Sequence, residues 1–75
     1  MLRQGLVCTL KWFDFKKGYG FLTADDPAVG DIMIHRTVFR ETNNSLVPVP
    51  GGRLVVEAMQ VGGRWQATKI EQVGC

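Results

Sequence analysis

The segment at residues 17–24 (KGYGFLTA) sets two aromatic residues among glycines, next to a lysine. Side chains alternate between the two faces of a strand, so Tyr19 and Phe21 would share the face of Lys17 while the glycines face the other way. Unpaired bases stack on exposed rings at about 1–3 kcal/mol per base, and cations contact the phosphates. The pattern favours such a surface, but periodicity alone leaves open that the rings are core and the glycines face solvent.

A second segment, residues 31–35 (DIMIH), is compatible with the same surface. Its alternation places Ile32 and Ile34 in a core and turns Met33 and His35 outward. If this segment pairs with residues 19–24, Met33 and His35 lie beside the two aromatic rings. We therefore expect one outward face built from two neighbouring strands.

The elements that must position these residues are short and rich in β-formers. No helical periodicity of useful length is present, and Gly62-Gly63 is a hairpin signal. The long segment at residues 36–52 reads as a loop with one helical turn over residues 37–40. Closure of the sheet would remove exposed edges, so we predict an all-β fold, a small five-stranded antiparallel barrel of the OB type. The expected strands are residues 6–13, 19–24, 31–35, 53–61 and 65–73.

Length and composition limit what this chain can be. Its 75 residues fit a single domain over residues 1–75, with a folded core at about residues 5–73. Hydrophobic residues make up 45% and charged residues 21%, which is typical of a globular protein, and the net charge of +2 favours a polyanionic partner weakly. No apolar stretch approaches the ~18 residues of a membrane span, and no signal peptide is apparent. We expect a cytoplasmic protein that does not contact a membrane.

The predicted core follows from the alternation within each strand. The fifth strand is ambiguous, because Thr68 and Ile70 share one face while Ala67 and Val73 share the other. Phe39, after the helical turn, is expected to anchor the core. The other core residues predicted are Cys8, Leu10, Leu22, Ile32, Ile34, Leu54, Val56 and Ile70.

Residues for catalysis or metal binding are sparse. His35 is the single histidine, and no serine, cysteine or acid has the spacing of a catalytic triad or of a ligand set. Two cysteines, Cys8 and Cys75, lack the paired spacing of a zinc site, so a buried thiol and a loose terminal one are expected. Asp25-Asp26 before a proline reads as a turn. We predict that the protein is not an enzyme and uses no metal or cofactor.

Three motifs carry a family resemblance. KWF at residues 11–13 followed by KGYGFL at residues 17–22 closely resembles the opening of bacterial cold-shock domains, with the first of their two ribonucleoprotein motifs. DIMIH at residues 31–35 resembles the second motif. The resemblance covers essentially the whole chain, because the spacing of the motifs and the long loop after them also match.

The resemblance implies a barrel that binds single-stranded RNA or DNA, as an RNA chaperone or a regulator of transcription or translation. It implies monomers, with a strand-exchanged dimer left open. Strict alternation would turn Trp12 inward, so this assignment needs the first strand to end or bulge near Lys11. The implied nucleic-acid-binding residues are Lys11, Trp12, Phe13, Lys17, Tyr19, Phe21, Met33, His35 and Arg36.

The chain departs from the family at several positions. Met33 and Arg36 stand where aromatic residues are usual, which shifts the site from stacking toward charge contact. Trp65 is expected to cap the barrel end, with a contact at the rim as the alternative. Phe15, where a small or polar residue is usual, either extends the aromatic surface or covers a turn. A barrel repurposed for protein–protein contact is the alternative function, which the retained Trp12 and its aromatic neighbours disfavour.

Overall fold

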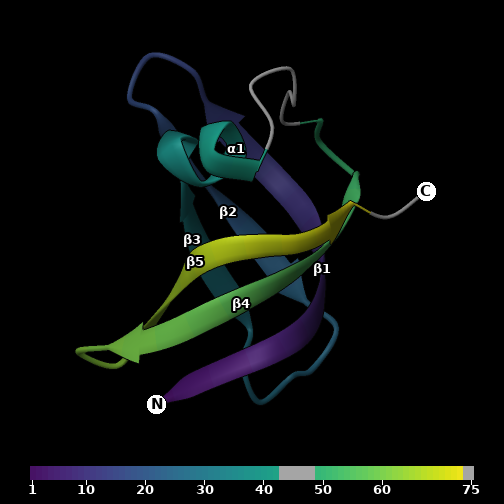
Figure 1. The fold of residues 1–75 in the computed structure, drawn as a ribbon, viewed down its shortest axis with the longest axis vertical. Coiled ribbons are helices and arrows are strands. Elements are labelled where there is room, and N and C mark those ends of the chain that lie inside the picture. The colour runs from purple at the N-terminus through teal and green to yellow at the C-terminus, as the bar shows by residue number, and fades with distance from the viewer. Residues whose placement is uncertain (43–48, 74–75) are drawn as a thin grey trace.

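The computed structural model describes residues 1–42 and 49–73. Five strands wrap around a single core, and one short helix lies across one end of the barrel they form (Figure 1). Residues 43–48 of the loop predicted over residues 36–52, and the predicted loose thiol of Cys75, lie outside the described residues. The elements are β1 (Leu2–Asp14), β2 (Tyr19–Ala24), β3 (Asp31–His35), α1 (Arg36–Thr42), β4 (Arg53–Val61) and β5 (Arg64–Val73).

The strands close into a barrel in the order β1-β2-β3-β5-β4. Neighbouring strands are antiparallel except β3 and β5, whose parallel pairing closes the barrel. The long connection after β3 makes this closure possible, because the chain must cross the barrel end before returning along β4. The predicted five-stranded barrel of the OB type is therefore confirmed.

The barrel interior holds the core, and every residue predicted for it is buried. Cys8, Leu22 and Ile32 have no exposed surface at all. Phe39 of α1 is 3% exposed and closes the barrel end, which confirms its predicted role as an anchor. The buried residues that the alternation did not identify are Leu6, Ala24, Val29, Val38, Ala58 and Ala67.

Irregular pairing explains the ambiguity of β5. Ala67 pairs with Ala58 and Ile70 with Val56, so both are buried although they are three residues apart. The register shifts between these pairs, which leaves Thr68 as an extra residue on β5. Simple alternation therefore fails along this strand.

The ends of three elements differ from the sequence prediction. β1 begins at Leu2 instead of residue 6. Gly5 has a φ of 67°, and the register with β4 shifts between Arg3 and Leu6. Alternation is interrupted there, so it does not reveal the pairs that precede Leu6. β5 begins one residue earlier than predicted, at Arg64. The single helical turn predicted over residues 37–40 is too short, since α1 includes seven residues.

Candidate nucleic-acid interface

A β-bulge in β1 determines where Trp12 lies. Leu10 pairs with Leu22, yet Trp12 pairs with Phe21, so Lys11 is the extra residue between them. The bulge reverses the alternation after buried Leu10 and turns Trp12 to the surface, where it is 40% exposed. The break in β1 near Lys11 that the sequence interpretation required is confirmed.

The bulge gathers three rings on the outer face of β1 and β2. The Trp12 ring centroid lies 5.3 Å from that of Phe21 and 5.9 Å from that of Tyr19, and the Tyr19 and Phe21 centroids are 6.4 Å apart. These separations and tilted ring planes are typical of aromatic pairs. Tyr19 and Phe21 are only partly buried, so they do not belong to the core. The orientation with both rings inside the barrel is therefore excluded.

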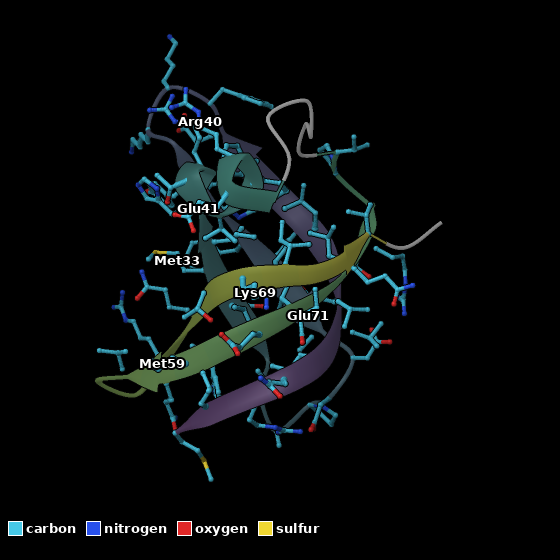
Figure 2. The ribbon with its side chains drawn as sticks, in the orientation of Figure 1. Met33, Arg40, Glu41, Met59, Lys69 and Glu71 are labelled. Atoms are coloured by element: carbon cyan, nitrogen blue, oxygen red, sulfur yellow. The ribbon has the colours of Figure 1, made fainter. Side chains whose placement is uncertain are left out.

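The neighbouring strand continues this face. On β3, Met33 pairs with Phe21 and His35 pairs with Tyr19, as expected from the alternation. Figure 2 shows the Met33 side chain pointing away from the barrel. We call the five residues of this face the platform: Trp12, Tyr19, Phe21, Met33 and His35.

The His35 ring is held by the start of α1. Its Nδ1 accepts a hydrogen bond from the backbone N–H of Thr37 at 3.4 Å, and the Thr37 hydroxyl lies 3.2 Å from the same nitrogen. These contacts hold the exposed ring in position beside Tyr19.

The cations around the platform differ in their partners. Lys17 and Arg36 are exposed at the α1 end, and neither forms an ion pair with a described residue. The Arg36 guanidinium lies over Gly18, within 3.4–3.6 Å of where a Cβ would stand there. The ammonium of Lys11, at the bulge, is 3.7 Å from the Asp31 carboxylate. That contact is solvent-exposed and therefore weak, so a phosphate could replace it.

Short segments of the chain match two known proteins. No family model matches the chain. Over 26 residues the chain is 58% identical to a cold shock-like protein of Thermotoga maritima, and over 27 residues it is 52% identical to a cold shock protein of Arthrobacter globiformis. These segments span 35–36% of this chain and 36–39% of the relatives. The matches support a cold-shock domain.

Phe13, a predicted contact residue, and Trp65, predicted to cap the barrel end, both pack against the core. Phe13 turns away from the platform, and its partly buried ring packs at 5.6 Å and 87° against Phe39 of α1. Trp65 packs against the core as the predicted cap does, but it also lines a groove of about 500 Å³ with Phe21 and Met33. The groove thus continues from the platform toward the β4–β5 hairpin, a feature that sequence periodicity does not reveal.

Acidic residues gather at the other end of β2. Asp26 Oδ1 accepts the backbone N–H of Ala28 at 2.9 Å, which confirms the predicted turn. That hydrogen bond, and then the Arg3 guanidinium 3.1 Å away, hold the pKa of Asp26 below its usual value. Asp25 pairs with Arg53 at 2.8 Å. The carboxylates of this end are thus engaged with cations of the same chain.

Residues 1–42 and 49–73 contain no group of three His, Cys, Asp or Glu side chains placed to hold a metal ion. Among the same residues, no helix is long and apolar enough to cross a membrane.

Proposed function

We propose that this cold-shock domain binds single-stranded RNA or DNA on the platform, as an RNA chaperone or a regulator of transcription or translation. The observation that carries the proposal is the β-bulge at Lys11, which keeps Trp12 exposed beside Tyr19 and Phe21. A barrel of this size gains stability by burying large side chains, so three rings held at the surface suggest a use outside folding.

The rings suit unpaired bases. Each base offers a flat apolar face to a ring, whereas the bases of a duplex are already stacked on one another and hidden. Trp12, Tyr19 and Phe21 would each accept a base, and Met33 would pack its thioether against the next one. Binding of this kind keeps a strand unpaired, which is what an RNA chaperone does.

Contacts between cations and phosphates would raise the affinity for strands of any base sequence. Lys17 and Arg36 stand next to Tyr19 and His35, so phosphates that follow the stacked bases would meet them. Phosphate contacts carry no sequence information, and stacking accepts every base. We therefore expect low sequence preference and affinity that falls as salt rises.

The test measures fluorescence anisotropy of a labelled single strand, with the matched duplex as competitor. Replacing Tyr19 or Phe21 by alanine should weaken binding by about fivefold or more per ring. Val7→Ala is the matched control, because Val7 is 39% exposed on β1 but is not part of the platform. Equal affinity for duplex and single strand, or unchanged affinity in both ring variants, would refute the proposal.

A further inference from the structure

Beyond the platform, we propose that a bound single strand continues over the β1–β2 turn, where Phe15 stacks a further base and Lys16 contacts its phosphate. This inference rests on the proposed function and adds a site outside the platform. It gives a role to an aromatic residue for which the fold provides little cover. Three features of the turn support it: the exposure of the ring, the order of the backbone and the distribution of charge.

Phe15 is more exposed than the platform ring Trp12, at 59% against 40%. Its ring packs edge-on against Phe13, with centroids 5.2 Å apart and planes at 62°. Phe13 in turn packs against buried Phe39. The row leads from the core to the surface, so Phe15 is supported on one side while much of its surface stays open to solvent. A ring supported in this way can accept a base without reorganising the core.

The turn that carries Phe15 is well ordered by hydrogen bonds. Asp14 Oδ1 accepts the backbone N–H groups of Lys16 at 2.9 Å and Lys17 at 3.0 Å, and the Asp14 carbonyl accepts the Gly18 N–H at 2.8 Å. The Gly18 carbonyl accepts the Arg36 N–H at 2.8 Å, which joins the turn to the start of α1. Because Asp14 also pairs with Tyr19, Phe15 directly follows a residue that adjoins the platform. A preorganised site loses little entropy on binding.

Charge favours this end of β2 for a polyanion. Lys16, Lys17 and Arg36 form no ion pair with any residue in the described ranges. All carboxylates in such pairs, Asp25, Asp26 and Asp31, lie at the β2–β3 turn or at the start of β3. A strand leaving the platform thus meets three cations and one carboxylate, Asp14, at the β1–β2 turn, and three carboxylates at the opposite end.

The charges of α1 also favour a strand that leaves the platform over the β1–β2 turn. Arg40 lies four residues after Arg36 in α1, and therefore on the same side of the helix as Arg36, which contacts Gly18 of the β1–β2 turn. Glu41, the acid of this helix, lines a different groove together with Lys69 and Glu57. The acid therefore faces β5 instead of the turn, and the cations Lys16, Lys17 and Arg36 outnumber the Asp14 carboxylate near Phe15.

The experiment compares a short oligonucleotide with a long one, since single barrels of this type bind about 4–16 nucleotides. Phe15→Leu keeps apolar bulk against Phe13 but removes the aromatic face, and Phe15→Tyr keeps that face. We expect Phe15→Leu to weaken the binding of a strand of about ten nucleotides by about fivefold. Its affinity for a strand of about four nucleotides should be unchanged. Phe15→Tyr should bind both strands as the wild type does. Lys16→Gln should lower the salt dependence for the long strand alone.

A photo-cross-link gives an independent readout. In a series of long strands, each carries one 5-iodouracil at a different position. We expect cross-linking to Phe15 from a position outside the segment that contacts Trp12. Unchanged binding of the long strand by Phe15→Leu, or equal losses for both lengths, would overturn the inference while the platform stands. Failure of the wild type to bind either strand would overturn the proposed function as well.

Discussion

Gly20 lies so close to the bulge in β1 that a Cβ on it would overlap the carbonyl oxygen of Trp12. The same atom would also stand 2.8 Å from the Phe13 Cα and 2.8 Å from its ring, closer than side-chain atoms approach in proteins. Glycine therefore permits the close approach of β2 to the bulge that turns Trp12 outward. Trp12 and Gly20, eight positions apart in the sequence, therefore form one structural unit.

We predict that Gly20→Ala destabilises the domain by about 1–3 kcal/mol, because β1 and β2 must separate to admit the methyl group. Thr23→Ala, at an exposed position of the same strand, is the matched control and should change stability by less than about 0.5 kcal/mol. Urea unfolding of both variants measures the difference. Equal stability of the two variants would show that the strands adjust to a side chain at Gly20.

Met33→Phe should strengthen binding of single strands by about fivefold, since a second ring opposite Phe21 gives a base a wider surface than a thioether does. Met33→Leu is the control, because it keeps the apolar volume without the ring or the sulfur. Anisotropy titrations of the three proteins at one salt concentration make the comparison. An unchanged affinity in Met33→Phe would mean that no base reaches this position.

Arg36→Gln should make binding less dependent on salt. If the guanidinium held over Gly18 contacts one phosphate, the slope of log K against log salt falls by about 0.7. The control is Arg53→Gln, whose guanidinium is already paired with Asp25 at the opposite end of β2. A loss of affinity with an unchanged slope would instead assign stacking, and not phosphate contact, to Arg36.

Burial raises the pKa of the Cys8 thiol from 9.0 to about 11, with a further rise from the Asp25 carboxylate that Arg53 partly offsets. In the unfolded chain the thiol ionises near its ordinary value, so ionisation favours unfolding between these two pH values. The free energy of unfolding should therefore fall by up to about 2–3 kcal/mol as pH rises from 9 to 11. Below pH 9 this contribution to stability is fully present.

Urea unfolding at several pH values tests the Cys8 prediction in a Cys75→Ser background, where Cys8 is the remaining thiol. Changes in stability that do not come from Cys8 must be subtracted, so a Cys8→Ala variant in the same background is the reference. The difference between the two proteins should shrink as pH rises. A difference that stays constant from pH 8 to pH 11 would show that the folded thiol ionises normally.

Alternation predicted the faces of the strands that contain no bulge. In β2 and β3 each step of the chain reverses the face, so alternation grouped Tyr19 with Phe21 and turned Met33 and His35 outward. It left open which face of β2 points outward, and strict alternation places Trp12 inside. The outward face of β2 and the bulge at Lys11 therefore needed family knowledge. The prediction was therefore most secure where the strands are regular.

Features that depend on contacts between distant segments could not be read in this way. The pairing with β4 decides which residues of β5 are extra, and neither Thr68 nor Glu71 has a mark in the sequence that identifies it. Phe13 lies between Trp12 and Asp14 in the chain, but its surroundings are set by Phe39 of α1. The groove beside Trp65 likewise requires the parallel pairing of β3 with β5.

The central claim is that Trp12 is an exposed ring on which bases stack. The most direct test is the fluorescence of a Trp65→Phe variant, in which Trp12 is the remaining tryptophan, during titration with a short single strand or the matched duplex. We predict that the single strand quenches Trp12 in a saturable, salt-sensitive manner, and that the duplex does not. Absence of quenching and of binding at low salt would contradict the account, and a protein partner should then be sought for this face.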